Sequence, residues 1–147
     1  MAEVLSQHKV VVGWAREGEF SHTGFERKHQ LDFGNQARLL AGGAGNDFGS
    51  DPEQMLAAAL ASCHMLTFLT LAAKKRLQVV SYDDEAVAEL SRRDDGKFYV
   101  STIRLFPAVV FEGDQPDAET IEAMHHKAHD HCFIANSLSC EVVVEPR

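Results

Sequence analysis

The most apolar stretch of the chain runs from Ser50 to Lys75, and its hydrophobic positions do not alternate with polar ones. No Asp, Glu, Lys or Arg occurs between Gln54 and Ala73, although charged residues make up 24% of the sequence. A helix that is apolar on every side has to be buried in protein or in lipid. Ser50 and Glu53 form a Ser-x-x-Glu capping pattern, and basic residues crowd the other end. We therefore predict one long helix over residues 50–75.

This stretch is long enough to span a bilayer, so a membrane helix has to be weighed against a core helix. Ser62, His64, Thr67 and Thr70 lie inside it, and the segments around it alternate like strands of a soluble protein, which favours the core helix. A chain of 147 residues forms about one domain, which we place at residues 1–147. The rest of one such domain is too small to cover the whole helix. We therefore predict an intimate homodimer, in which a partner chain helps to cover it.

Three short β-type runs are expected ahead of the helix, at His8–Ala15, Phe20–Phe25 and Arg27–Phe33, separated by turn-forming residues. Residues Leu40–Asp51 contain four glycines and have no periodicity, so we predict a loop there. Glycine in such a loop lets the backbone approach another group closely.

Two long β-type runs follow the helix, Gln78–Arg92 and Lys97–Phe111, and an Asp-Gly pair between them predicts a hairpin. Pro107 places the second run at a sheet edge or breaks it. Then follow an amphipathic helix, a short segment and a last strand, at Asp117–Asp130, Cys132–Leu138 and Cys140–Glu145. The order predicts an α+β fold with antiparallel strands around a long, central, buried helix.

The net charge of the chain is −8 and its pI is about 5.4, which argues against nucleic acid as a partner. The chain has three cysteines, and no positively charged leader precedes an apolar run at its start. We therefore expect a cytoplasmic protein with reduced thiols and no membrane partner.

The three cysteines occupy different surroundings. Cys63 lies in the middle of the apolar helix, where a free cysteine often serves as a small hydrophobic residue. Cys140 opens a Val-rich strand and is predicted to be core filler. Cys132 stands beside His129 and His131, near the start of a short helix, and both features lower the pKa of a thiol.

A metal site at the histidine-rich segment His125–His131 is the alternative use of these residues. His125, His126, His129 and His131 lie beside Cys132, His125 and His129 are one turn apart on one helix face, and zinc accepts His and Cys. A second ligand pair at zinc-finger spacing is missing. We therefore favour a polar face in which one or two histidines tune Cys132, and we predict no metal ligands and no cofactor.

Two segments of the chain resemble the signature of the OsmC/Ohr family. The first is Asp51-Pro52-Glu53-Gln54-Met55-Leu56 followed by Cys63, and the second is Ala128-His129-x-x-Cys132-x-Ile134-Ala135-Asn136-Ser137-Leu138. The resemblance extends over the whole chain. It implies an intertwined homodimer and a thiol peroxidase that acts on organic hydroperoxides.

The resemblance also implies roles for individual residues. Cys63 would be the peroxidatic thiolate that becomes a sulfenic acid, and Cys132 would resolve it to a disulfide. A dithiol, lipoyl groups in the Ohr branch, would then regenerate both thiols. Glu53 would be the glutamate that helps to hold the thiolate and the peroxide.

The arginine that the family also uses has three candidates here. Arg16 resembles the arginine in the G-R-D-G turn of the Ohr branch, Arg38 resembles the arginine position of the OsmC branch, and Arg27 is the third. We favour Arg16. A guanidinium keeps its charge beside a buried thiol and stabilises the thiolate.

Glu53 and Cys63 are ten positions apart, which is about 15 Å along an ideal helix, so they cannot touch within one helix. If Glu53 serves Cys63, it is therefore the partner chain's, and the site is composite. The named branches commonly carry Phe after the first cysteine and Pro after the second, whereas here His64 and Phe133 follow. These departures indicate a branch outside the two named ones.

His64 could be a base, a ligand or a core histidine with one hydrogen bond, and we favour the last. The substrate-pocket walls are expected among Phe48, Met65, Phe68 and Phe133. The function that we favour is a two-cysteine peroxidase for apolar hydroperoxides. The alternative is a non-catalytic dimer of the same fold that holds a small molecule or a metal, and a pure binder would not need the paired cysteines.

Overall fold

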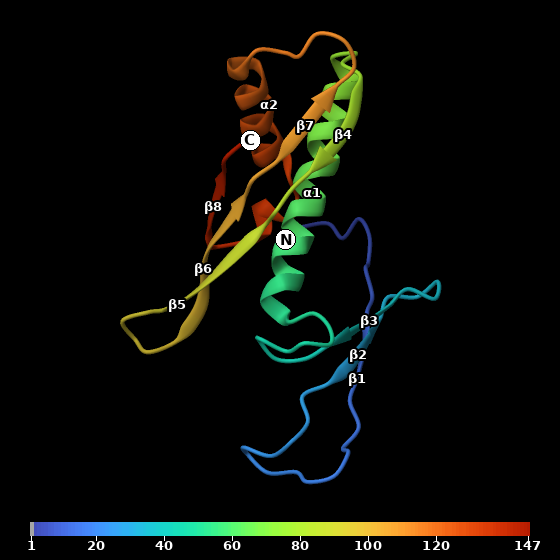
Figure 1. The fold of residues 1–147 in the computed structure, drawn as a ribbon, viewed down its shortest axis with the longest axis vertical. Helices are drawn as coiled ribbons and strands as arrows, with labels where there is room; N and C mark the ends of the chain where they lie inside the picture. Colours follow the sequence, from blue (N-terminus) through green and yellow to red (C-terminus); the bar gives the residue numbers. More distant parts are fainter. Residues whose placement is uncertain (1) are drawn as a thin grey trace. The chain divides into compact units, whose positions relative to one another are not determined.

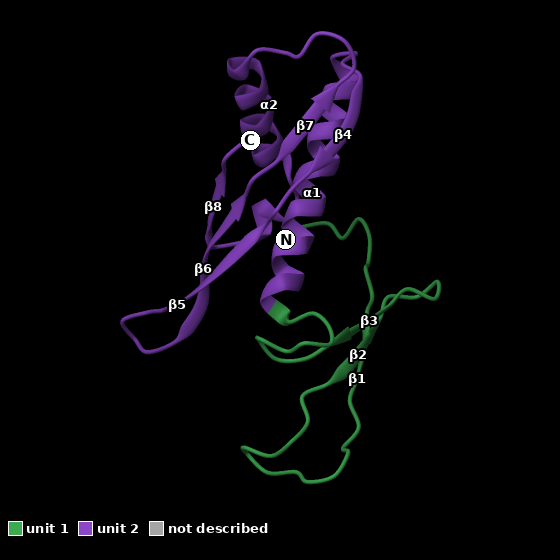
Figure 2. Ribbon diagram, viewed as in Figure 1, with its two compact units in different colours: residues 1–52 green, residues 53–147 purple. Residues whose placement is uncertain are grey.

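The computed structural model describes residues 2–147, and the chain divides into two compact units, Met1–Pro52 and Glu53–Arg147 (Figure 2). The first unit contains three short strands, β1 (Val11–Gly13), β2 (His29–Asp32) and β3 (Arg38–Ala41). From the end of the first unit onwards, the elements are α1 (Pro52–Lys74), β4 (Val79–Asp83), β5 (Val87–Arg92), β6 (Phe98–Leu105), β7 (Ala108–Phe111), α2 (Ala118–His131), the 3-10 helix η1 (Ala135–Ser137) and β8 (Glu141–Val144) (Figure 1). The two helices and the antiparallel sheets confirm the predicted α+β class.

The first unit is an antiparallel sheet in the order β1-β2-β3. Three strands are present as predicted, but the strand expected at Phe20–Phe25 is wrong. This segment makes a turn, because the backbone N–H of Gly24 donates to the hydroxyl of Ser21 at 3.0 Å and that of Phe25 donates to the Ser21 carbonyl at 3.2 Å. The third strand is β3, which lies partly inside the predicted loop.

The glycine-rich loop after β3 is held by the side chain of Asn46. Its carbonyl oxygen accepts the backbone N–H groups of Phe48 and Gly49, and its amide donates to the carbonyl of Gly43 at 2.8 Å. A Cβ on Gly49 would lie 2.0 Å from the carbonyl oxygen of Leu40. At Gly49 the backbone of the loop therefore approaches the backbone of Leu40 in β3 closely, which only a glycine permits.

The helix α1 begins two residues later than predicted, at Pro52, so Asp51 takes the N-cap position in place of Ser50. Proline suits the first helical position because its missing N–H would have no partner there. The hydroxyl of Ser50 donates to the carbonyl of Asp51 at 3.2 Å. The predicted helix is thus confirmed over nearly its full length.

The predicted hairpin is present, and each of its long arms is broken into two strands. Gly96 has a φ of +87° in the turn, and the backbone N–H of Arg93 donates to the carbonyl of Lys97 at 2.8 Å. The second arm breaks before Pro107, as expected for a residue that cannot donate to a ladder. Asp84 bridges the breaks in the two arms by accepting the N–H of Phe106 at 2.7 Å.

The last strand departs from the antiparallel pattern that the sequence predicts. β8 pairs with β6 in parallel, with Ile103 opposite Val142. α2 starts at the predicted position, where the Asp117 side chain accepts the N–H of Thr120 at 2.8 Å. These elements bring the C-terminal end of α2 and η1 to the side of α1 in the second unit (Figure 1).

Two apolar clusters pack along α1 inside the second unit. The first cluster joins the N-terminal half of α1 to β5, β6, η1 and β8, with Leu60, Ile103, Leu105 and Cys132 fully buried. The second joins the C-terminal half of α1 to β4, β7 and α2 around Phe68. Burial of this apolar area stabilises the unit and fixes which face of α1 points inward.

The other face of α1 is not covered by the elements of the second unit. The buried positions of α1 form a single stripe, Ala57, Leu60, His64, Phe68 and Ala72. On the opposite side Leu66 is 58% exposed. By length and composition alone α1 could also cross a membrane, the one helix of residues 2–147 for which this holds. The uncovered face is what the prediction of a partner chain requires.

Between the two clusters, His64 of α1 meets His125 of α2. The His64 Nε2 and His125 Nδ1 atoms are 3.0 Å apart, and the two rings stack at a centroid distance of 5.3 Å. The residues are 0% and 2% exposed. His64 is therefore a core histidine with one hydrogen bond, as predicted. Burial lowers the pKa of each histidine to about 4, and for His64 the positive charges of His125 and His129 add to this effect.

The histidine pair makes the stability of the fold depend on pH. In the unfolded chain both imidazoles take up protons near pH 6.5, whereas in the folded chain they stay neutral down to about pH 4. Their contribution to stability is therefore present above pH 6.5 and is lost as the pH falls to 4. Two such groups change the free energy of unfolding by up to about 2.7 kcal/mol per pH unit. Denaturant unfolding between pH 7 and 4 should show this loss, and the loss should be smaller in His64→Phe; equal slopes would contradict the assignment.

Candidate active site

The structure brings Cys63 and Cys132 together. Cys63 lies in the middle of α1 and is partly exposed, whereas Cys132 caps the C-terminal end of α2 and is fully buried. The two side chains lie within hydrogen-bond reach of each other, and both thiols are free. The two cysteines that the sequence singles out therefore meet, although they are far apart along the chain.

The surroundings of the two sulfurs differ in a way that separates their pKa values. Burial raises the pKa of Cys63, but hydrogen bonds from the Cys132 thiol and from the backbone N–H groups of Ile134 and Phe133 lower it, and the net pKa is below the ordinary thiol value. A hydrogen bond from Thr67 lowers the pKa of Cys63 by a smaller amount. The Thr67 hydroxyl also donates to the Cys63 carbonyl at 2.8 Å. Cys63 is thus the thiol that ionises first.

Cys132 shows the opposite shift, which corrects the prediction that a helix start and nearby histidines lower its pKa. Burial, followed by the hydrogen bond to Cys63, raises the pKa of Cys132 to about 11. The sulfur accepts the backbone N–H of Ala135 at 3.4 Å, but its side chain packs against the apolar cluster of Leu60, Ile103 and Leu105. The polar neighbours in sequence do not surround it in space.

An open groove of about 870 Å³ leads to Cys63 along the uncovered side of α1. Its walls are mostly apolar, with Leu66 and Leu71 from α1 and Phe133 and Ile134 after α2. It also carries three basic side chains, Lys74, Lys127 and His131. Lys74 lies eleven residues beyond Cys63, which is about 16 Å along the helix. The groove can hold an elongated apolar molecule with one end at the sulfur.

The predicted aromatic walls have mixed outcomes. Phe133 lines the groove and is 81% exposed, whereas Phe68 lies fully buried on the inward face of α1 and cannot line it. The groove residues of α1 follow Cys63 at helical spacing, so the sequence alone could have given Leu66, Thr67 and Lys74. Lys127 and His131 come from another helix, and no local pattern identifies them.

Glu53 and Cys63 stay apart within one chain, as predicted. Glu53 is in the first turn of α1 and Cys63 is ten residues further along the same unbroken helix. This separation corresponds to about 15 Å. A contact between the two residues therefore needs the Glu53 of a second chain.

The three candidate arginines belong to the first unit, whereas both cysteines belong to the second. Arg16 follows β1 and is exposed. Arg38 opens β3 and lies 3.5 Å from the carboxylate of Asp32. Each of these positions is compatible with a binding role, and none is singled out by its contacts.

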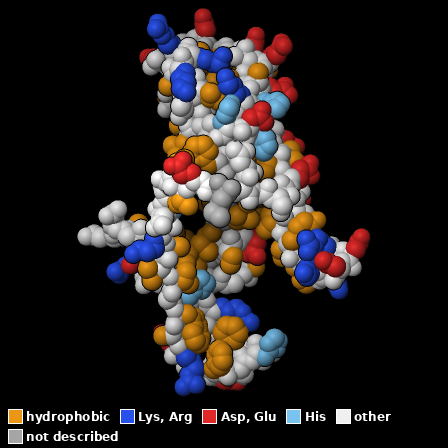
Figure 3. Space-filling view, turned by 180° about the vertical axis from the view of Figure 1, so that it is seen from behind, with side chains coloured by type: hydrophobic (Ala, Val, Ile, Leu, Met, Phe, Trp, Pro, Cys, Tyr) orange, Lys and Arg blue, Asp and Glu red, His pale blue; other side chains and the backbone are white. Residues whose placement is uncertain are grey.

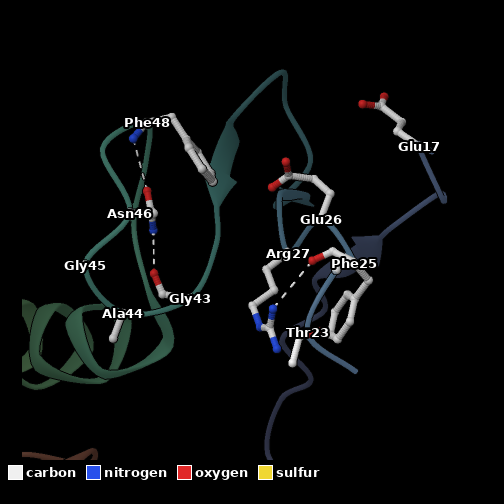
Figure 4. Close-up of a pocket in the computed structure, with 11 residues that line it drawn as sticks. Glu17, Thr23, Phe25, Glu26, Arg27, Gly43, Ala44, Gly45, Asn46 and Phe48 are labelled. Atoms are coloured by element: carbon white, nitrogen blue, oxygen red, sulfur yellow. Dashed lines mark hydrogen bonds between the residues drawn. The ribbon is translucent and has the colours of Figure 1, made fainter. Parts of the chain in front are cut away.

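Arg27, the third candidate, lines a pocket of about 460 Å³ beside the glycine-rich loop (Figure 4). Its guanidinium lies 4.2 Å from the ring centroid of Phe25 and donates to the Phe25 carbonyl at 3.4 Å. Phe25 also contacts the exposed rings of Trp14 and Phe20. Figure 3 shows exposed hydrophobic side chains on the face of the molecule that it presents. Arg27 is therefore held by an aromatic surface, with several donors free for a ligand.

The histidines of α2 point to different places. His125 bonds to His64, His126 lies 3.7 Å from Asp130, and His131 lines the Cys63 groove. Within residues 2–147 no three His, Cys, Asp or Glu side chains gather in a way that could hold a metal ion. The histidine-rich segment therefore supplies single residues to separate environments.

The fold and the site together define an α+β protein with two neighbouring thiols, one at the middle of a long apolar helix. The family described as OsmC-like protein matches residues 43–147. The chain belongs to this family, which confirms the resemblance.

Solved structures agree with this assignment over nearly the whole chain. An OsmC-like protein of unknown function from Vibrio cholerae is 40% identical, with a TM-score of 0.88, and the match covers 97% of this chain and 100% of that one. The organic hydroperoxide resistance protein OhrB of Bacillus subtilis is 17% identical, with a TM-score of 0.74 and coverage of 98% and 100%. An organic hydroperoxide resistance protein from Legionella pneumophila is 16% identical, with a TM-score of 0.69 and coverage of 98% and 97%. The comparison with curated proteins gives no match.

The unequal pKa values of the two thiols predict unequal reactivity. At pH 7 iodoacetamide should modify Cys63 faster than Cys132, because the thiolate is the reactive form. Cys132→Ala removes the donor to Cys63, so it should raise the pKa of Cys63 and slow its alkylation. Cys132→Ser keeps an O–H donor and serves as the matched control. Mass spectrometry of each peptide against pH measures both effects; faster labelling of Cys132 would contradict the assignment.

Proposed function

We propose that this protein is a two-cysteine peroxidase that reduces organic hydroperoxides. The observation that carries the proposal is the pairing of a low-pKa, accessible thiol, Cys63, with a buried, high-pKa thiol, Cys132, within hydrogen-bond reach. Membership of the OsmC family, with neighbours of the same fold that are named organic hydroperoxide resistance proteins, supports it. A protein that only bound a small molecule would not need this pair.

In the first step the Cys63 thiolate attacks one peroxide oxygen of ROOH and the O–O bond breaks. The leaving alkoxide takes a proton and departs as the alcohol ROH, while Cys63 becomes a sulfenic acid. The sulfur is oxidised by two electrons and the peroxide is reduced by the same two. Hydrogen bonds from Phe133, Ile134 and Cys132 favour the ionised form of the sulfur beforehand.

In the second step the Cys132 sulfur attacks the sulfenic sulfur of Cys63. The S–O bond breaks, and the hydroxyl group leaves as water with the proton of the Cys132 thiol. A disulfide between the two cysteines results. A dithiol, such as a lipoyl group, then exchanges with this disulfide and restores both thiols while becoming a disulfide itself.

The groove beside Cys63 supports an organic rather than a small inorganic peroxide as the substrate. Leu66, Leu71, Phe133 and Ile134 offer apolar walls to a hydrocarbon chain whose hydroperoxide end reaches the sulfur. Burial of that chain supplies binding free energy that hydrogen peroxide cannot gain.

Thiol counting tests the proposal directly. One equivalent of an organic hydroperoxide should remove two titratable thiols per chain, because Cys63 and Cys132 form a disulfide, and a dithiol should restore both. Cys63→Ser should abolish the loss. Cys132→Ser should leave Cys63 as a sulfenic acid that dimedone traps, and Cys140→Ser is the control that should still lose two thiols.

Two results would contradict the peroxidase proposal. One is that all three thiols of the reduced protein stay titratable after exposure to the hydroperoxide. The other is that the disulfide forms between chains through Cys140 rather than between Cys63 and Cys132. Peptide mapping under non-reducing conditions distinguishes these outcomes.

We also propose that the active protein is a homodimer with composite sites, in which Glu53 of one chain serves Cys63 of the other. The uncovered face of α1 and the separation of Glu53 from Cys63 within one helix support this arrangement. An arginine from the first unit, Arg16 in our proposal, would complete the site by stabilising the thiolate.

Mixed dimers test the composite site. We expect Glu53→Gln and Cys63→Ser homodimers each to lose at least about tenfold in peroxidase rate. A heterodimer that contains one chain of each, isolated with two different tags, regains one complete site and should show about half of the wild-type rate, since a twofold dimer has two sites. A heterodimer as inactive as both parents would show that Glu53 acts within its own chain, and a Glu53→Gln homodimer with the wild-type rate would show that Glu53 has no role.

A further inference from the structure

The buried contact between His64 and His125 lies beside the proposed reaction centre. His64 directly follows Cys63 on α1. His125 lies in α2, seven residues or about two helical turns before Cys132, which caps the end of that helix. The two segments that carry the cysteines are therefore joined at two points, once by the sulfurs and once by the imidazoles. The second point lies about 10 Å from the first along α2.

Two separated points fix a helix more completely than one. A single contact at Cys132 would leave α2 free to pivot about that residue, whereas a second contact at His125 also fixes its rotation and its position along α1. Phe68, one turn after His64, stacks on His125 at a centroid distance of 4.3 Å. His125 is thus held by contacts with two residues of α1.

The His64–His125 hydrogen bond favours this one arrangement of the two helices. Both imidazoles are buried, and His64 Nδ1 and His125 Nε2 have no hydrogen-bond partner. If α2 shifted, the remaining ring nitrogens would also lose their partner in an apolar environment, which is costly. The contact therefore opposes small displacements that packing alone would tolerate.

We propose that the His64–His125 pair is a positioning device that holds α2 against α1 so that Cys132 captures the Cys63 sulfenic acid quickly. The inference rests on the proposed peroxidase function. Disulfide formation requires close and specific placement of the two Cβ atoms. Attack of the peroxide on Cys63 depends on this placement only through the hydrogen bonds that lower the pKa of Cys63, because the peroxide itself diffuses in. The pair thus acts on the second chemical step much more than on the first.

Separate measurement of the two steps tests the proposal. After rapid mixing with one equivalent of an organic hydroperoxide, acid quenching and mass spectrometry follow the sulfenic acid and the disulfide at pH 7. His125→Phe should leave the rate of Cys63 oxidation within about twofold of wild type and slow disulfide formation by about tenfold or more, because small misplacement of reacting groups costs this much. It should also increase sulfinic acid at excess peroxide, since the sulfenic acid persists.

Matched variants keep the test decisive if His125→Phe folds poorly. His125→Asn keeps a hydrogen-bonding group near the position of Nδ1 and should slow disulfide formation less than His125→Phe. His126→Phe changes the next residue of the same helix, which is exposed, and should leave both steps unchanged. His64→Gln tests the other side of the contact and should behave like His125→Asn.

The pH dependence of the rate of disulfide formation distinguishes a positioning role from a merely structural one. His129 of α2 and Tyr82 of β4 are the other titratable groups that face the pair. A hydrogen bond between two imidazoles needs one unprotonated nitrogen, so it is lost when both rings are charged. The ratio of wild-type to His125→Phe disulfide rates should therefore fall toward one as the pH falls through about 4, where the two imidazoles take up protons. The effects of pH on Cys132 itself are the same in both proteins and cancel in this ratio.

Failure of this inference and failure of the peroxidase function give different results. A folded His125→Phe protein that forms the disulfide at the wild-type rate, or that slows both steps equally, would overturn the positioning role and leave the peroxidase intact. A wild-type protein that loses no thiols to the hydroperoxide would overturn both.

Discussion

The contact between the Cys63 and Cys132 thiols depends on one constraint, the lack of charge along α1. Because no residue from 54 to 73 carries a charge, this helix can lie between two apolar clusters and still present Cys63 at its middle. A charged residue in the buried stripe would require a partner that the clusters do not offer. The site therefore exists because the helix that carries it can be buried on one side.

The same constraint explains why the second unit is incomplete by itself. Its strands and α2 cover one stripe of α1, and the opposite stripe, which includes Leu66, remains exposed next to the groove at Cys63. Apolar surface of this kind is unfavourable in water unless another surface covers it. In the homodimer that we propose, a second copy of the chain meets two requirements at once, because it covers this stripe of the helix and supplies Glu53 to the site.

The sequence predicts those features that local patterns control. The uncharged run predicts α1 to within two residues, Asp-Gly predicts the hairpin turn at Gly96, and Asp117 predicts the start of α2. The failures concern contacts between distant residues. The parallel pairing of β6 with β8, the burial of Cys132 and the approach of Lys127 to the groove depend on tertiary packing, which no local period encodes. The segment Phe20–Phe25 makes a turn at Ser21 instead of the predicted strand, and the prediction fails there because the residues that flank this turn favour strands.

The different environments of the two thiols determine which of them ionises more readily, without reference to any relative. Hydrogen-bond donors from Phe133, Ile134 and Cys132 converge on Cys63, so the negative charge is stable there, whereas the apolar cluster around Cys132 disfavours charge. A thiolate held by hydrogen bonds keeps its nucleophilicity only if its pKa is not lowered too far. In the reaction that we propose, Cys63 no longer needs the proton that Cys132 shares with it once Cys63 is oxidised, and that proton leaves with the water that forms. Under this proposal each sulfur creates the conditions under which the other reacts.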